Sequence, residues 1–438
     1  MTDRASVAHL LRRATFGPTA TEIDEATKSG VEATVDRLLR PSTADRGAAA
    51  TPVPEFGPDP YAERGGGLSR EEKLRRKQTR REQVQALTEW WLTRMAAAEH
   101  QLTEKMVFFW HGHWATSVQK VKSAPLMLGQ LKTFREYGRA DFLTLTRAML
   151  RDPALILWLD GQRNTSRAPN ENLARELMEL FTLGVGAYSE ADIKAGARAL
   201  TGWTVDRAAG TSTVASRRHD RGDKTILGVT APFDADSYAD LLVRQPAHAR
   251  FLATRLWTRF GSAEPQAATV DRLVSAYGQG RDVDGMLRAL LLDDSFGASR
   301  GQLVKQPVEW LVGAIRQLRI STGADGLKKQ RISGGLRALG QLPLRPPSVG
   351  GWPTGTAWLT TSSALERLRL AVALASAAHD SVLSSLDSGS TASAADALAH
   401  TLAVDGWTDR TRAALAEAGG NPRRRLAVGL ASPEYAVM

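Results

Sequence analysis

Hydrophobic residues recur every three to four positions along most of the chain, which is the spacing of one face of an α-helix. This pattern predicts helices over 7–14, 21–30, 31–40, about 70–98 and 102–114. It continues over 126–138, 141–152, 170–184, 189–203, 236–260, 265–278, 282–293, 303–321, 328–340 and 362–378. The sequence therefore predicts a mainly α fold, a single large multi-helix domain over 1–438.

Four segments interrupt the helical spacing. Residues 41–69 are rich in Pro, Gly and Ala without periodicity, and we expect a surface loop there. Apolar and polar residues alternate near 204–228, which predicts a small β-hairpin inserted among the helices. Residues 341–355 contain too much Pro and Gly for a helix or a strand, and the Ala/Ser-rich stretch 380–403 fits no clear pattern.

The chain carries a formal net charge of +10 at pH 7, with an isoelectric point near 10.0. A positive protein favours anionic partners, either small molecules or polymers. Seven of the basic residues lie within 69–82, at the start of the long predicted helix. The plainer interpretation of this run is a solvated helix face. A nucleic-acid site is less favoured, because no aromatic residues alternate with the charges to stack on bases.

The sequence contains no cysteine. This excludes disulfides, zinc–thiolate sites, iron–sulfur clusters and cysteine nucleophiles. The first residues include no apolar run of signal-peptide length, because Arg12 and Arg13 interrupt it. No stretch reaches about 18 uninterrupted apolar residues, the length that a membrane span needs. We therefore expect a soluble, cytoplasmic protein with no membrane span.

The predicted helix over 170–184 carries a polar stripe beside its apolar face. Asn172, Glu176 and Glu179 fall on this stripe, and Arg175 lies at its edge. Two carboxylates three residues apart repel each other if both are ionised in dry surroundings, so solvent, an arginine, a shared proton or a cation must compensate. The pattern leaves two interpretations open: a surface pair screened by water, and a buried pair that binds a metal or exchanges protons.

Two histidines, His111 and His113, stand one residue apart between Trp110 and Trp114. They could ligate a metal, bind or activate substrate, or pack in the core. Together with Glu176 and Glu179 they would form a donor set that suits zinc, iron or manganese. This set is the metal-site hypothesis.

Two further polar segments are candidates for the same site. In the run 219–225, His219 and Asp220 could bind a metal or act in catalysis, and Lys224 could hold an anionic substrate; a plain charged turn is the alternative. Trp352, in a segment rich in Pro and Gly, could wall a pocket or merely connect two helices. Phosphate-cradling loops, dinucleotide-binding fingerprints, Gly-x-Ser-x-Gly elbows and His-Glu-x-x-His motifs do not occur.

Several stretches occur in an order that matches a bacterial family. They are HLLRRATFGPT (9–19), FFWHGHWATS (108–117), NENLARELMELFTLGVGAYSEADIKAGARALTGW (170–203), HDRGDKTILG (219–228), VKQPVEWLVGAIRQL (304–318), PPSVGGWPTGTAWL (346–359) and ASPEYAV (431–437). On these motifs the chain resembles, nearly end to end, the domain of unknown function DUF 1800. The resemblance implies a largely helical single-domain protein and supplies no activity.

Two functional hypotheses follow. The first is a metal-assisted hydrolase or related enzyme acting on a polar or anionic substrate, a glycan or a phosphoester. In it Glu176, Glu179, His219 and Asp220 are catalytic, while Arg175, Lys224, Asn172 and Trp352 bind substrate. The second is a non-catalytic helical protein that binds an anionic polymer or a protein partner, with the polar motifs fixing the fold. Both require side chains from separated segments to meet.

Overall fold

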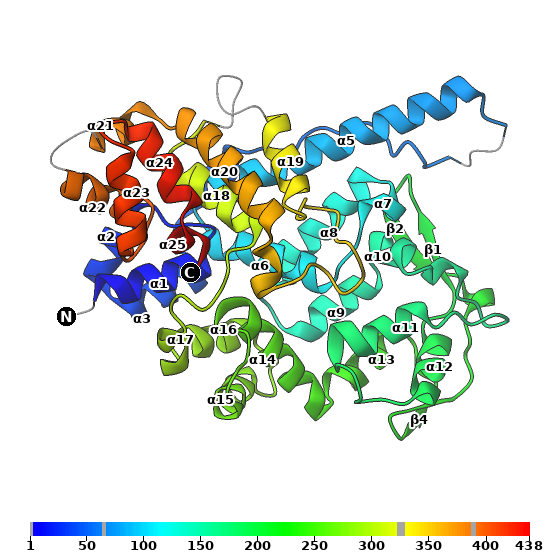
Figure 1. Ribbon diagram of the computed structural model, residues 1–438. Coiled ribbons are helices and arrows are strands. Elements are labelled where there is room, and N and C mark those ends of the chain that lie inside the picture. The colour runs from blue at the N-terminus through cyan, green and yellow to red at the C-terminus, as the bar shows by residue number, and fades with distance from the viewer. Residues whose placement is uncertain (1–2, 64–66, 322–328, 387–390) are drawn as a thin grey trace.

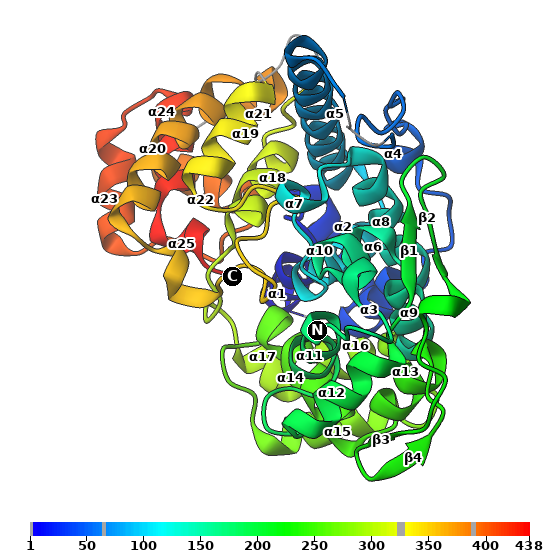
Figure 2. The ribbon, with the colours of Figure 1, turned by 90° about the vertical axis from the view of Figure 1, so that its right-hand side faces the viewer.

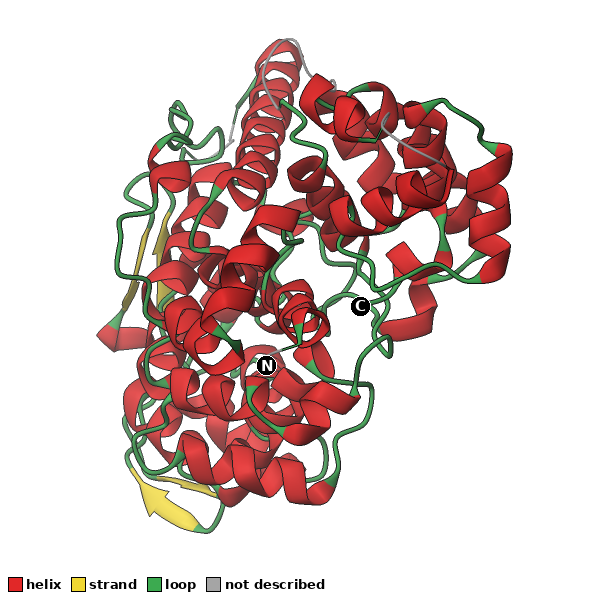
Figure 3. Ribbon diagram, turned by 90° about the vertical axis from the view of Figure 1, so that its left-hand side faces the viewer, coloured by secondary structure: helices red, strands yellow, loops and turns green. Residues whose placement is uncertain are grey.

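The structure, a computed structural model, describes residues 3–63, 67–321, 329–386 and 391–438. Helices form most of the molecule, and two small sheets lie at its edge (Figures 1 and 3). This confirms the prediction of a mainly α fold. Among the described residues, no helix combines the length and the apolar character needed to cross a lipid bilayer.

The first helices follow the predicted spacing closely. They are α1 (Arg4–Ala14), α2 (Ala20–Ser29), α3 (Val31–Leu39), α4 (Arg46–Ala49), α5 (Arg70–Ala97), α6 (Gln101–His113), α7 (Val118–Val121), α8 (Ala124–Tyr137), α9 (Phe142–Leu150) and α10 (Pro153–Trp158). The long helix α5 begins where Ser69 and Glu72 cap each other's backbone N–H groups. The expected surface loop over 41–69 contains the short helix α4.

The middle of the chain departs from the predicted helices at two places. Its helices are α11 (Asn172–Glu176), α12 (Glu190–Ala199), α13 (Ala235–Val243), α14 (Pro246–Phe260), α15 (Ala267–Tyr277), α16 (Val283–Leu291) and α17 (Asp294–Ala298). The predicted helix over 236–260 is two helices, because Pro246 lacks an N–H group and restricts the residue before it. The predicted helix over 170–184 changes at Leu177 into a π-helix, Leu177–Thr182.

Two antiparallel hairpins replace the single one predicted near 204–228. Strand β1 (Trp203–Asp206) pairs with β2 (Thr211–Val214), and β3 (Lys224–Ile226) pairs with β4 (Val229–Ala231). The second hairpin turns through Leu227 and Gly228, both with positive φ, which fits a tight two-residue turn. The prediction missed this hairpin because charged residues hide its alternation.

The last third of the chain forms a group of helices drawn yellow to red in Figure 2. They are α18 (Pro307–Gln317), α19 (Lys329–Ala338), α20 (Thr361–Ser376), α21 (Asp380–Ser385), α22 (Thr391–Thr401), α23 (Asp409–Glu417), α24 (Pro422–Ala431) and α25 (Pro433–Ala436). Short 3-10 helices cover Gly161–Arg163, Ser216–Arg218 and Gly355–Trp358. The Ala/Ser-rich stretch that fitted no pattern contributes α21 and α22.

One continuous apolar core runs through the molecule, with members from Leu10 to Tyr435. Helix α6 lies within it, and all but two of its thirteen residues are buried. Helix α5, by contrast, projects beyond the body over its first half (Figure 1). Polar groups on α6 are thus removed from water, so each needs a partner or a function.

Candidate functional site

Both histidines of α6 are buried, and their contacts fix the position of the ring proton. The Leu344 backbone N–H donates to Nε2 of His111 over 3.0 Å, so the proton of this ring must be on Nδ1. Nε2 of His113 is 2.9 Å from the Phe181 carbonyl oxygen, which can only accept, so His113 carries its proton on Nε2. At Nδ1, His111 therefore offers a buried N–H and His113 a lone pair. Neither of these two atoms has a hydrogen-bond partner among the described residues.

Both rings are neutral at pH 7. Burial lowers the pKa of His111 to about 3. Burial, followed by the positive charge of Arg255, holds the pKa of His113 well below its usual value. A neutral imidazole that presents a lone pair can accept a hydrogen bond, while a cationic imidazole cannot.

The donor set of the metal-site hypothesis is not brought together. Nε2 of His111 is occupied by an N–H donor and its other nitrogen carries the proton, so this ring has no lone pair left for a metal. Across the described ranges, no three His, Cys, Asp or Glu side chains form a group that could hold a metal ion.

The carboxylate pair lies where α11 becomes a π-helix, a local widening that is frequent at functional sites. Both side chains are half-buried, so the pair is neither fully solvated nor enclosed. The Tyr188 hydroxyl donates to Glu179 over 2.8 Å. Burial, together with repulsion from Glu179, raises the pKa of Glu176. Arg175 does not neutralise the pair directly; it forms ion pairs with Glu171 at 3.0 Å and Glu190 at 2.7 Å.

The other proposed substrate-binding groups make internal contacts. Nδ2 of Asn172 donates to the Leu159 carbonyl over 3.2 Å. Nζ of Lys224 donates to the backbone carbonyls of Asp220 and Phe233 over 2.6 and 2.8 Å, and thereby fastens the second hairpin.

His219 and Asp220 belong to the same local cluster near the end of α12. Nδ1 of His219 donates to the Thr201 carbonyl over 3.0 Å. Asp220 forms an ion pair with Arg198 at 2.7 Å, which lowers the pKa of the Asp220 carboxyl. Among the described side chains, no hydrogen bond or ion pair joins this cluster to the carboxylate pair or to the histidines of α6. The sequence candidates thus form three groups that no such bond between their side chains connects.

A pocket of about 100 Å³ does bring distant segments together, and we call it the anion pocket. Its wall comes from α6, α14, the residue before α18 and the segment rich in Pro and Gly: Phe108, Phe109, Gly112, His113, Arg255, Thr258, Arg259, Gln306, Gly350, Trp352 and Thr354. The indole of Trp352 stacks on Phe108 with ring centroids 6.0 Å apart and lies 5.3 Å from the ring of His111.

Two arginines of α14 give the pocket its charge. Arg259 forms an ion pair with Glu309 at 2.8 Å, and its side chain is only 9% exposed. Arg255 is half-buried, and burial lowers the pKa of its guanidinium. In the described part of the chain its buried Nε has no hydrogen-bond partner and the side chain forms no ion pair. A guanidinium drawn partly out of water without a counter-ion is a candidate to bind an anion.

Behind the pocket, cations outnumber carboxylates. The ammonium of Lys105 contacts Glu309 and donates to the Thr15 carbonyl over 2.8 Å. Burial lowers the pKa of Lys105 to about 8, even though Glu309 opposes this. Arg13 is fully buried, donates to two backbone carbonyls, and has its pKa lowered by burial to about 9. Glu309 is thus the one carboxylate in contact with Lys105 and Arg259 among the described residues.

The sequence contained a signal for these arginines that was overlooked. Arg255 and Arg259 stand four residues apart in an otherwise apolar stretch with Leu256, Trp257 and Phe260. Like charges at this spacing repel along a helix. Two arginines at this spacing beside the buried face of a helix therefore indicate either a counter-ion from elsewhere in the fold or an anionic ligand.

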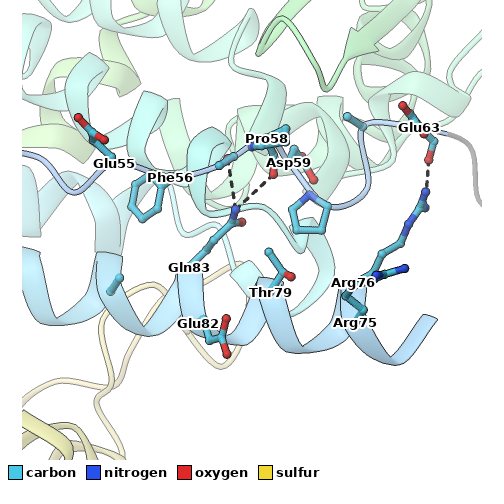
Figure 4. Close-up of a pocket in the computed structure, with 14 residues that line it drawn as sticks. Glu55, Phe56, Pro58, Asp59, Glu63, Arg75, Arg76, Thr79, Glu82 and Gln83 are labelled. Carbon is cyan, nitrogen blue, oxygen red and sulfur yellow. Dashed lines mark hydrogen bonds between the residues drawn. The ribbon is translucent and has the colours of Figure 1, made fainter. Parts of the chain in front are cut away.

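A larger pocket of about 560 Å³ lies between residues 55–63 and α5 (Figure 4). Four carboxylates line it, those of Glu55, Asp59, Glu63 and Glu82, against the two arginines Arg75 and Arg76. This excess of negative charge makes it a poor site for an anionic substrate.

The anion pocket draws on three of the segments that carry the family motifs: α6, the region of Gln306 and that of Trp352. A comparison with curated proteins and with solved structures finds no match. The sequence model of the family described as protein of unknown function, DUF1800, matches residues 9–437, so this chain belongs to that family.

Proposed function

We propose that this protein is a hydrolase or related enzyme that acts on a polar, anionic substrate, of the glycan or phosphoester class. In this proposal the anion pocket receives the charged group of the substrate. The observation that carries the proposal is Arg255, a half-buried guanidinium that lines a pocket, with a buried unpartnered Nε and no ion pair within the described residues. Arginine binds phosphate, sulfate and carboxylate groups through two parallel N–H donors.

The size of the pocket limits what enters it. Pockets that enclose a whole drug-sized ligand measure about 300–1,000 Å³. A volume of about 100 Å³ has room for a small charged group but not for a sugar chain, so the rest of the substrate would lie outside. Trp352 then provides an apolar wall, and the lone pair of His113 provides an acceptor for a hydroxyl of the substrate or for water.

The catalytic roles of Glu176, Glu179, His219 and Asp220 stay predictions. Of these, Glu176 is the best acid–base candidate, because its pKa is raised and its neighbour Glu179 is itself held by Tyr188. The metal-assisted form of the hypothesis also stays a prediction, which elemental analysis of the purified protein tests. The proposal itself needs no metal for binding.

Replacing Arg255 by methionine separates binding from folding. Calorimetric titration with inorganic phosphate and sulfate should show that the native protein binds these anions. R255M should bind them at least about tenfold more weakly, because a charge-assisted contact contributes about 1.5–3 kcal/mol. The midpoint of urea unfolding should stay the same or rise, since an unpaired, half-buried charge is removed. The matched control is R217M, at an exposed arginine. Equal binding by both variants, or no binding by the native protein, would refute the anion pocket.

Turnover decides between enzyme and binding protein. We expect the native protein to hydrolyse at least one of a panel of chromogenic phosphate esters, sulfate esters and glycuronides, and R255M to lose that activity. The alternative, a non-catalytic binding protein, is favoured by the internal contacts of His111, Asn172 and Lys224, which stabilise the fold. Binding of phosphate or sulfate without turnover on any of these esters would support that alternative.

A further inference from the structure

We infer that a second, separate site binds a linear anionic polysaccharide along helix α5. The site is an open groove of about 550 Å³ between the first half of α5 and the short helix α7, and we call it the basic groove. It shares no residue with the anion pocket. The inference therefore does not depend on the proposed function.

Cations dominate the lining of the basic groove. Glu63 is the one carboxylate among its lining residues. Six cations line it, from α5, from the region of α7 and from the first hairpin: Lys73, Arg76, Lys77, Lys120, Lys122 and Arg207. Within the described chain, Arg207 forms an ion pair with Asp59 at 3.0 Å and Lys120 with Asp160 at 2.7 Å.

Three of the four remaining cations of the groove are free to meet an anionic ligand, and the fourth, Arg76, donates to a backbone carbonyl. The three, Lys73, Lys77 and Lys122, are exposed and have no ion pair among the described residues. Such an excess of one charge in a hollow surface attracts anions over a distance of roughly one Debye length, about 10 Å at 0.1 M salt.

A second group of cations, outside the groove, involves another part of α5. Arg345 is half-buried, and burial followed by repulsion from Arg337 and Arg80 lowers the pKa of its guanidinium. Nε of Arg345 has no hydrogen-bond partner in the described structure. Arginines from α5, α19 and the segment rich in Pro and Gly thus act on one another, and none of the three forms an ion pair with a described carboxylate. An extended polymer, rather than a single small anion, fits charges spread along a helix.

One wall of the groove is held in place by its neighbour, the larger pocket of Figure 4. Tyr61 and Glu63 line the groove and belong to the segment 55–63. This segment is fastened to α5 in the larger pocket, where Gln83 donates to the carbonyls of Gly57 and Pro58 over 3.2 Å (Figure 4). Arg76 donates to the carbonyl of Glu63 over 3.3 Å at the edge of the groove. A fixed wall reduces the ordering cost of binding.

The chemistry of the groove favours a sugar chain over a nucleic acid. Single-stranded nucleic acids are held by aromatic rings on which bases stack, at about 1–3 kcal/mol per base. The aromatic ring of the groove, Tyr61, has the Arg207 guanidinium over its face, 5.9 Å from its centre. Lysines act as point charges that adapt to varied spacing, which suits sulfate or carboxylate groups on sugars.

The test compares two triple variants of equal net charge. In the groove variant, three exposed lysines are replaced: K73Q, K77Q and K122Q. In the control variant, exposed cations elsewhere are replaced: K28Q, K194Q and R423Q. The probes are a heparin oligosaccharide and an oligothymidylate of equal charge, titrated at about 0.1 M salt, where charges are only partly screened.

The native protein and the control variant should bind the heparin oligosaccharide alike, and the groove variant about tenfold more weakly, with a shallower dependence on salt. The native protein should also bind heparin more tightly than oligothymidylate. Equal losses in both variants would overturn the groove as the site, as would no binding by the native protein. Tighter binding of oligothymidylate would overturn the assignment to a polysaccharide. These results do not depend on whether R255M loses phosphate binding, because Arg255 lines the anion pocket and not the basic groove.

Discussion

Lowering the pH from 6.5 to about 5 is expected to reduce the free energy of unfolding by about 5 kcal/mol. The cause is a set of four buried, neutral histidines: His9, His111, His113 and His248. Burial lowers the pKa of His9 and His248 to about 4 and that of His111 to about 3. In the unfolded chain these groups take up protons below about 6.5, so the unfolded state gains stability as the pH falls.

One buried carboxyl acts in the opposite direction. Burial raises the pKa of Asp152 to about 7, so between its usual value and pH 7 the folded state holds a proton that the unfolded state has released. Burial also lowers the pKa of Lys305 to about 7, so over this range its ammonium is largely protonated in both states and changes stability little. The net difference averages about two to three protons, and each changes stability by about 1.4 kcal/mol per pH unit. The expected loss is large beside the roughly 5–15 kcal/mol that stabilise a typical domain.

Urea unfolding followed by circular dichroism at several pH values between 7 and about 5 measures this loss. The slope of stability against pH counts the protons taken up on unfolding. The H379S variant serves as control, because His379 is exposed and serine keeps its helix cap. Its slope should equal that of the native protein. Constant stability over this range would show that the four rings are not held neutral in the folded state.

Replacing Glu309 by glutamine is expected to cost about 3–5 kcal/mol, the usual penalty for removing one member of a buried ion pair. Glutamine can keep the contact with the Gln306 N–H that caps α18. It cannot neutralise Lys105, which is fully buried, or Arg259, which is nearly so. The native ion pairs hold the pKa of Glu309 at about 2, despite burial. Urea unfolding at pH 7 measures the change in free energy.

Two further variants give this prediction its controls. E190Q removes an exposed carboxylate that pairs with Arg175, and an exposed pair contributes about 0–1 kcal/mol. The double variant E309Q and K105M removes both partners, so its loss should be smaller than the sum of the single losses. A loss below about 1 kcal/mol for E309Q would mean that the cations are compensated by solvent.

The helices could be predicted because their signal is local. The spacing of apolar residues and the cap at Ser69 are contained within a few turns, and α5 begins and ends within two residues of its prediction. The hydrogen bonds of the two histidines could not be predicted from local sequence. Whether Nδ1 of His111 or of His113 carries the proton depends on the backbones of Leu344 and Phe181, which lie far away in the sequence.

The candidate site was missed for the same reason. Ligand chemistry alone suggested that His111 and His113 meet Glu176 and Glu179, whereas the fold places His113 beside Arg255 and Arg259. Trp352 was a candidate, and it does line this pocket. The π-helix was also missed, because apolar spacing alone does not distinguish it from an α-helix over one turn.

The most direct test of the account is a crystal structure of the protein soaked in selenate, which is isosteric with sulfate and gives an anomalous signal. The account predicts an anomalous peak in the anion pocket, with oxygens within hydrogen-bond distance of the guanidinium groups of Arg255 and Arg259. Peaks confined to the outer surface, or a protein carboxylate paired with Arg255 in the crystal, would contradict it.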